Sequence, residues 1–251
     1  MSFTAPVLNY AQLAPMLIVL GGALIGVLIE AFAPRASRHT SQLFITVAAL
    51  VTSFAALMQV RTQSSADAAM GSVAFDGAGV LLQASILIIA LLSVFLIADQ
   101  ENFTALPAAV PGSHEERESL QLDLRVTEVY PLTLFAVAGM LLFPVSTDLI
   151  TLFVALEVLS LPLYLMAGLS RRRRLMSQEA ALKYFLLGAF SSAFFLFGAA
   201  YLYGYSGSIT FAGIQSSVVG GSGNDVFLLL GIAFISVGLL FKVGAVPFHA
   251  W

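Results

Sequence analysis

Three charged residues stand inside long apolar stretches of the sequence: Glu157, Lys183 and Lys242. The two lysines are the only lysines in the chain, and the other basic residues are arginines outside the apolar stretches. A charge at the centre of a membrane-spanning helix costs about 2.5–3.5 kcal/mol in insertion scales. Such residues usually face the interior of a helix bundle or a water-filled cavity, where they mark paths of ions or protons.

A glutamate and lysines in such surroundings have the chemistry of a proton relay. Burial disfavours the charged form of a lysine, whereas a carboxylate close by favours it. A lysine beside Glu157 therefore changes its charge as the distance between the two groups changes. The relay requires that the side chains meet, and the sequence alone leaves this contact open.

Glu157 and Lys183 differ in how far they lie from water. Glu157 is about eight residues, or roughly 12 Å, from Leu149 at the start of its apolar stretch, close to the middle of a membrane core of ~30 Å. Lys183 lies near the start of its own stretch, so its long side chain can also reach the interface. Glu179 stands four residues before Lys183, which is the favourable order for an ordinary ion pair on a helix. Both interpretations of Lys183 stay open.

Lys242 gains interest from the residues that follow it. Gly244 and Pro247 come next in the sequence, and proline kinks or breaks a helix. Transporters place broken helices at their binding sites. His249 follows the break and lies either at a hydrated channel mouth or merely at the membrane interface. We take Glu157, Lys183, Lys242 and His249 as the candidate proton-carrying residues.

The elements that must position these residues are apolar segments of about 20 residues, the length that spans a bilayer as a helix. In lipid, a helix satisfies its own backbone hydrogen bonds. We predict an all-α integral membrane protein with about seven transmembrane helices, which cover roughly Leu13–Phe32, Gln42–Val60, Gly79–Ala98, Val126–Val145, Leu149–Leu169, Ser177–Tyr203 and Val226–Val246.

Composition supports this class. Hydrophobic residues make up 59% of the 251 residues and charged ones 10%, against about 25% charged in soluble domains. The small net charge of -3 gives no indication of a nucleic-acid partner. The absence of cysteine excludes disulfides and thiolate metal centres. We expect no catalytic or metal-ligating residue in this chain, and a retained first helix in place of a signal peptide.

Arginine predicts the orientation. Eight arginines fall in alternate connections, and the positive-inside rule puts those connections in the cytoplasm and the N-terminus outside. They are Arg35, Arg38, Arg117, Arg125, Arg171, Arg172, Arg173 and Arg174. The connection before Val226 is rich in glycine and serine and is expected to be an outside loop, with Asn224 or Asp225 capping the next helix.

Small residues recur at four-residue spacing in two of the segments. Gly22 and Gly26 do so in the first, and Gly188 and Ser192 in the sixth. This spacing is typical of helices that pack closely in membranes. We interpret both pairs as packing positions.

Three motifs together resemble a known family. The stretches DLITLFVALEVLSLPLYLMAGLSRRR, EAALKYFLLGAFSSAFFLFGAAYLYGYSGS and GLLFKVGAVPFHAW are similar to the antiporter-like subunits of respiratory complex I, the NADH-quinone oxidoreductase. The resemblance is specific from Val126 to Trp251 and general before that. It implies that Glu157, Lys183, Lys242 and His249 form the cytoplasm-facing part of a proton path.

The resemblance also implies an architecture. Family members have about fourteen helices in two inverted repeats, so the chain corresponds to an incomplete, N-terminal half with a broken seventh helix. Residues 1–125 are expected to form three N-terminal helices and a polar cytoplasmic loop. Residues 126–251 are expected to form the first four helices of the first, truncated repeat.

The implied function is that of a proton-translocating subunit without a redox centre of its own. NADH, FMN, iron–sulfur clusters and quinone are expected in partner subunits, and no cofactor in this chain. The expected partners are a neighbouring antiporter-like subunit, small membrane subunits and the lipids of a bacterial plasma (inner) membrane. The alternatives are a subunit of a multi-subunit sodium/proton antiporter and one of a membrane-bound hydrogenase.

Overall fold

The computed structural model describes residues 8–62, 68–99, 112–114, 117, 126–169, 174–221, 223–246 and 248. The regular elements in these ranges are helices. They are α1 (Tyr10–Phe32), α2 (Arg35–Val60), α3 (Gly77–Ala98), α5 (Val129–Leu142), the 3-10 turn η1 (Phe143–Val145), α6 (Leu149–Leu169), α7 (Arg174–Ser206), α8 (Phe211–Gly220) and α9 (Asp225–Val243).

The prediction of an all-α integral membrane protein is confirmed. Six described helices are long and apolar enough to span a membrane, namely α1, α2, α3, α6, α7 and α9. A seventh apolar helix, α5 with η1, is shorter and covers Val129–Val145. Large hydrophobic side chains on the outward faces are exposed, as Phe44 and Ile89 illustrate, and a bilayer would cover them.

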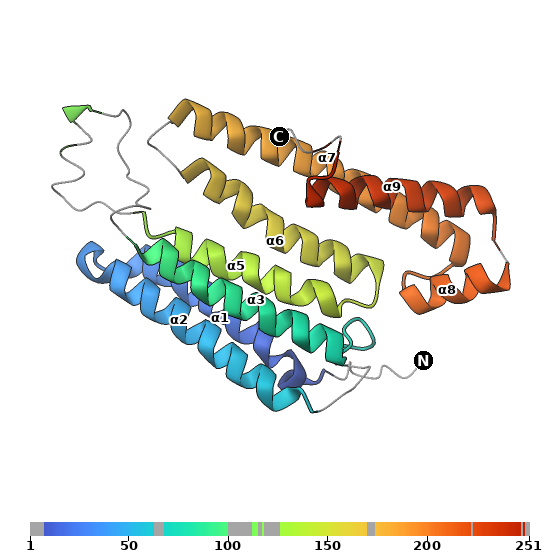
Figure 1. Cartoon of the computed structure of the whole chain (residues 1–251), viewed down its shortest axis with the longest axis horizontal. Coiled ribbons are helices and arrows are strands. Elements are labelled where there is room, and N and C mark those ends of the chain that lie inside the picture. The colour runs from blue at the N-terminus through green and yellow to red at the C-terminus, as the bar shows by residue number, and fades with distance from the viewer. Residues whose placement is uncertain are drawn as a thin grey trace.

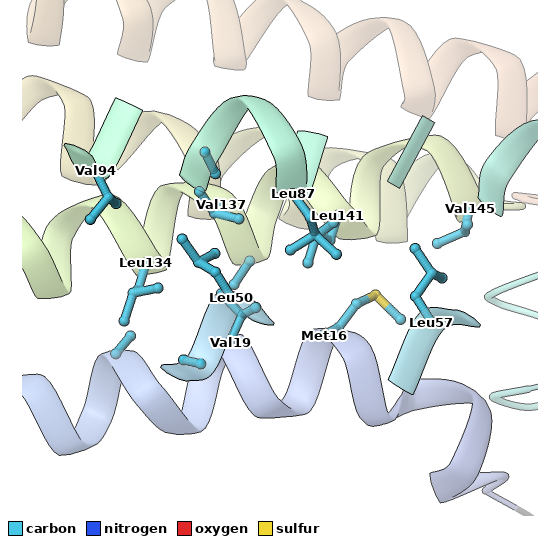
Figure 2. Packing of buried hydrophobic residues seen from close by; sticks show 14 of the residues in the cluster. Met16, Val19, Leu50, Leu57, Leu87, Val94, Leu134, Val137, Leu141 and Val145 are labelled. Atoms are coloured by element: carbon cyan, nitrogen blue, oxygen red, sulfur yellow. The ribbon is translucent and has the colours of Figure 1, made fainter. Parts of the chain in front are cut away.

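The helices lie side by side in two groups (Figure 1). In the first group α1 packs against α2 and α5, and α3 packs against α2 and α5. In the second, α7 packs against α6 and α9. The contact between α5 and α6 joins the groups. The larger apolar core fills the first group, where Val19, Leu50, Leu57, Leu134 and Leu141 are fully buried (Figure 2).

Glycines allow the closest helix approaches. A side chain on Gly22 would stand 2.6 Å from Cβ of Ala49 on α2. A side chain on Gly188 of α7 would collide with the hydroxyl of Tyr164 on α6. The packing role predicted for these glycines is therefore confirmed.

The helix starts carry side-chain caps. The carboxylate of Asp76 accepts a hydrogen bond from Gly79 N at 2.6 Å, and that of Asp148 accepts from Ile150 N at 2.9 Å. Asn224, of the two residues considered for α9, accepts from Val226 N at 3.0 Å. These bonds satisfy backbone donors that a helix start leaves free.

Two details of the sequence prediction are wrong. The connection before α9, expected to be a loop, contains the helix α8. Thr210 caps α8 by accepting from Gly213 N, and Gly221 ends it in the left-handed conformation at φ +61. Arg35 and Arg38, expected in a connection, lie in the first turns of α2, and Arg174 opens α7.

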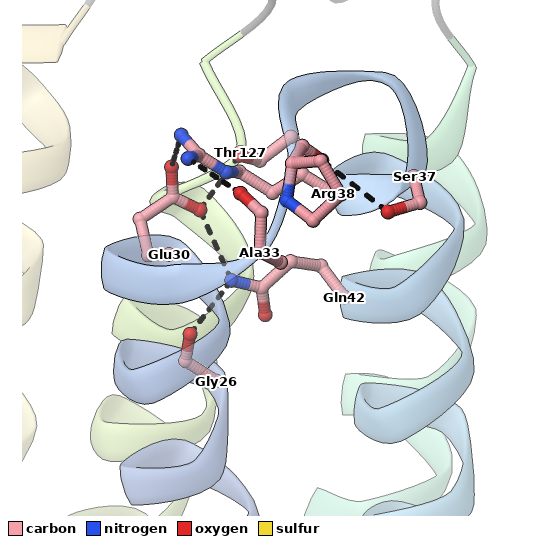
Figure 3. Close-up of polar contacts among 8 residues, drawn as sticks. Gly26, Glu30, Ala33, Ser37, Arg38, Gln42 and Thr127 are labelled. Carbon is pink, nitrogen blue, oxygen red and sulfur yellow. Dashed lines mark hydrogen bonds and ion pairs between the residues drawn. The ribbon is translucent and has the colours of Figure 1, made fainter.

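A polar cluster ties α1, α2 and the start of α5 together at one end of the bundle (Figure 3). The carboxylate of Glu30 pairs with Arg38 at 2.9 Å and accepts hydrogen bonds from Gln42 at 3.1 Å and Thr127 at 2.7 Å. Gln42 also donates to the carbonyl of Gly26 at 2.8 Å. Glu30, at the end of α1, is thus held by α2 and by Thr127, which precedes α5.

Candidate functional site

Glu157 and Lys242 meet between α6 and α9. Lys242 Nζ lies 3.7 Å from Oε1 of Glu157. The side chain of Lys242 is 14% exposed and that of Glu157 is 25% exposed. The contact that the sequence left open is therefore present. Since both groups are largely enclosed, their attraction is weakened by water less than that of a surface pair.

The end of α9 positions Lys242. The helix ends at Val243, and Gly244 follows in the left-handed conformation at φ +67. The N–H of Gly244 donates to the carbonyls of Leu240 and Phe241 in the last turn. The helix therefore ends beside Lys242, as predicted. Pro247, on which the predicted break of the helix rests, lies outside the described residues.

The packing of α9 on α7 sets the depth of Lys242. Ser191 Oγ donates to the carbonyl of Gly238 at 2.9 Å, and a side chain on Gly238 would stand 3.0 Å from Cβ of Phe195. The backbone of α9 at Gly238 is thus in close contact with side chains of α7, one turn before Lys242. This fixes the height at which α9 presents its lysine to α6.

Three uncharged residues complete the site, and the sequence analysis did not find them as site residues. Lys242 Nζ donates to Ser160 Oγ at 2.8 Å and to the Tyr164 hydroxyl at 3.3 Å. Ser192 Oγ donates to Oε1 of Glu157. Ser160 and Tyr164 follow Glu157 by three and seven residues, so all three lie on one face of α6. That spacing was the signal available in the sequence.

Aromatic packing holds Tyr164 in place. Its ring makes edge-to-face contacts with Tyr184 at 4.5 Å and Phe185 at 5.9 Å between centroids. Lys242 Nζ lies 5.9 Å from the centroid of the same ring, within the range of a cation–π contact. The absence of a side chain at Gly188 leaves room for the hydroxyl. The ring of Tyr164 therefore keeps its hydroxyl beside the lysine.

Lys183 lies apart from this pair. Its Nζ contacts Oε1 of Glu179 at 2.5 Å, and the side chains are 59% and 63% exposed. This is the ordinary helix pair that the sequence offered as an alternative, and the contacts of Lys183 in the described structure do not reach Glu157 or Lys242. His249 lies outside the described residues.

The site places a carboxylate, an amine and hydroxyls within hydrogen-bonding reach. A hydroxyl both donates and accepts, a charged lysine only donates, and an ionised glutamate only accepts. Lys242 has its partners on α6, and Glu157 has a further partner on α7. The arrangement suits proton transfer between titratable groups.

Comparison with known proteins identifies relatives of this chain. Residues 146–251 match the family described as NADH:quinone oxidoreductase/Mrp antiporter, TM. The chain is 49% identical to NADH-quinone oxidoreductase subunit N 3 of Streptomyces griseus over 278 aligned positions, which cover 100% of the chain and 50% of that relative.

Solved structures show the same fold. A chain of respiratory complex I from Thermus thermophilus superposes with a TM-score of 0.70 at 31% identity, over 94% of this chain and 45% of that one. A chain of the Mrp complex from a Dietzia species superposes with a TM-score of 0.67 at 23% identity, over 96% of this chain and 42% of that one. This second likeness concerns the fold alone.

The matched residues and the superposed chain of complex I show an antiporter-like membrane fold. Within that class, the chain is similar to NADH-quinone oxidoreductase subunit N, with 48–50% identity to these curated relatives. It spans about half the length of the curated relatives it matches.

Proposed function

We propose that the chain contributes a cytoplasm-facing proton half-channel to a proton-pumping NADH-quinone oxidoreductase, respiratory complex I. The observation that carries the proposal is the enclosed Glu157–Lys242 pair, 3.7 Å apart between α6 and α9. A packing scaffold gains nothing from two opposite charges in lipid, because their loss of hydration is costly.

The proposed mechanism uses the distance between the two groups. Glu157 near Lys242 stabilises the ammonium, and withdrawal of the carboxylate favours release of the proton. Ser192 donates to Glu157, while Ser160 and Tyr164 accept from Lys242. Each group thus keeps a hydrogen-bond partner when the ion pair opens.

The energy for this movement comes from other subunits in the proposal. We place no redox centre in this chain and assign NADH oxidation, FMN, iron–sulfur clusters and quinone reduction to partner subunits. The partners are a neighbouring antiporter-like subunit and small membrane subunits. The sequence and name of the relatives support membership in such a complex.

Topology follows the arginines. We propose a bacterial inner-membrane location, with the N-terminus outside and the connection containing Arg171–Arg174 in the cytoplasm. Residues 1–125 then form the N-terminal unit and residues 126–251 the start of the first antiporter-like repeat. Lys183 and His249 remain proposed members of the proton path, Lys183 at its exposed edge.

Neutral variants of the pair, made in the full-length subunit within the whole complex, test the proposal. Glu157→Gln and Lys242→Met should each reduce NADH-driven proton uptake by proteoliposomes to a small fraction of the wild-type rate, because each leaves its partner without a counter-charge. Asp225→Asn is the matched control, since this exposed carboxylate lies at the opposite end of α9. Near-normal pumping by both variants of the pair would refute the relay.

The alternative is a subunit of a multi-subunit sodium/proton antiporter, since the matching family includes the Mrp antiporters. A membrane-bound hydrogenase subunit is the other alternative from the sequence. Purification of the full-length protein from its native membrane separates them. Copurifying NADH-dehydrogenase and quinone-site subunits support complex I, whereas small antiporter subunits and sodium-dependent proton flux support the antiporter.

A further inference from the structure

A pocket opens between α1, α5, α6 and α7. It has a volume of about 520 Å³, and its lining includes Glu30 of α1, Glu128 at the start of α5, and Tyr164, Leu165 and Gly168 of α6. Because α1 and α6 end and α5 begins there, the pocket lies at the end of the bundle that carries the polar cluster of Figure 3. The proposed topology puts this end toward the cytoplasm.

Tyr164 borders both this pocket and the Glu157–Lys242 site. Its side chain lines the pocket, and its hydroxyl lies 3.3 Å from Lys242 Nζ. A single phenol therefore connects the pocket with the lysine. Lys183 is not among the residues that line this space, and its amine is bound to Glu179.

The pocket has the size to hold water, and its mostly apolar lining carries three polar groups. Its volume far exceeds the ~30 Å³ that one water occupies in the liquid, and ordered water needs polar partners. Glu128 provides an exposed carboxylate and Tyr164 a hydroxyl, while the carboxylate of Glu30 is already bonded within the polar cluster. Glu128 is exposed, and its negative charge raises the local concentration of cations, protons included.

We propose that this pocket, the α1–α5–α6–α7 vestibule, is the route by which protons reach Lys242, with the Tyr164 hydroxyl as the final carrier. The inference rests on the proposed function and names the route within it. When Lys242 is neutral, its Nζ accepts the hydroxyl proton of Tyr164. The phenol oxygen then takes a proton from a hydronium in the vestibule, so that one N–H and one O–H bond form while two O–H bonds break.

Tyr164→Phe in the whole complex tests the final carrier. The variant keeps the ring that packs on Tyr184 and removes only the hydroxyl. We expect proton uptake to fall about five-fold, the effect of losing one typical hydrogen bond. The ratio of rates in H₂O and D₂O should rise, because proton delivery becomes limiting, whereas a purely structural defect leaves this ratio unchanged. Tyr203→Phe, which alters an exposed phenol near the other end of α7, should pump as the wild type does.

Leu165→Trp tests the vestibule itself. The larger side chain fills the pocket, and we expect lower proton uptake with normal assembly. Leu161→Trp is the matched control, because Leu161 lies one turn away on α6, is similarly exposed and does not line the pocket. Normal pumping by either Tyr164→Phe or Leu165→Trp, while Lys242→Met is impaired, overturns the route alone. Normal pumping by both Glu157→Gln and Lys242→Met overturns the proposed function.

Discussion

At the scale of residues, the site combines two charges with three neutral hydrogen-bonding groups. Glu157 and Lys242 were predictable, because a charge within an apolar helix is costly and therefore rare. Ser160, Tyr164 and Ser192 were not, since neutral polar side chains are common in membrane helices and often serve packing. Only the structure shows which side of α6 lies toward α7 and toward Lys242 of α9, and so which polar residues belong to the site and which serve packing.

Ser192 provides a prediction at this scale. Ser192→Ala removes the hydrogen bond to Glu157, and a bond to a charged group is worth about 1.5 kcal/mol or more. We expect about a ten-fold loss of proton pumping at that energy. Proton uptake by reconstituted full-length complex measures this.

Ser191→Ala is the neighbouring control. Ser191 donates to the carbonyl of Gly238 at 2.9 Å instead of to Glu157. This variant removes one contact between α7 and α9, so it should lower thermal stability in detergent by about 1 kcal/mol, with a smaller loss of pumping than Ser192→Ala. Equal pumping by both serine variants would contradict a role for Ser192 in holding Glu157.

At the scale of elements, the length of the apolar segments predicted the spanning helices. The polar start of α2 and the short helix α8 were not predicted. The α6 segment was predicted as Leu149–Leu169 and forms that helix. The α2 helix starts at Arg35, before the predicted Gln42, because hydropathy detects only the apolar part of a helix. The 10-residue helix α8 is too short to span and too rich in serine and glycine to be recognised, although Thr210 and Gly221 mark its ends.

The packing of α6 on α7 gives a prediction about Gly188. Gly188→Ala places a methyl group where the Tyr164 hydroxyl lies, so the helices must separate or the ring must move. Overpacking of this kind typically costs about 1–3 kcal/mol. A lower midpoint of thermal unfolding in detergent is the expected result.

Gly204 supplies the control on the same helix. A side chain there would meet Phe227 at 3.4 Å, which is ordinary contact distance. Gly204→Ala should therefore leave the unfolding midpoint unchanged or raise it, since alanine favours helix more than glycine does. A Gly188→Ala protein as stable as the wild type would show that α6 and α7 tolerate separation.

At the scale of the whole molecule, the two helix groups differ in what holds them. The first group has the larger apolar core, and buried polar side chains such as Gln42, Ser53 and Gln83 bond to backbone carbonyls of neighbouring helices. The second group carries the Glu157–Lys242 pair, whereas the Glu30–Arg38 pair lies at one end of the first group. The resemblance predicted a boundary before α5, whereas α5 packs against α1 and α3 of the first group as well as against α6.

The proposed orientation is testable on the whole molecule, because the chain contains no cysteine of its own. A single cysteine at Val219, which is 83% exposed on α8, should react with an impermeant thiol reagent in intact cells. A cysteine in place of Arg172 should react only after the membrane is opened. The reverse pattern would invert the topology.

The unequal lengths of α7 and α5 have a consequence for the surrounding lipids. The 33 residues of α7 rise roughly 50 Å, whereas α5 and η1 together rise roughly 27 Å, close to a typical hydrocarbon thickness. With this mismatch, α7 tilts or extends into the headgroup layer. Lys183 and Glu179, in the first turns of α7, then lie among lipid headgroups. Their ion pair responds to headgroup charge and salt, from which the Glu157–Lys242 pair is shielded.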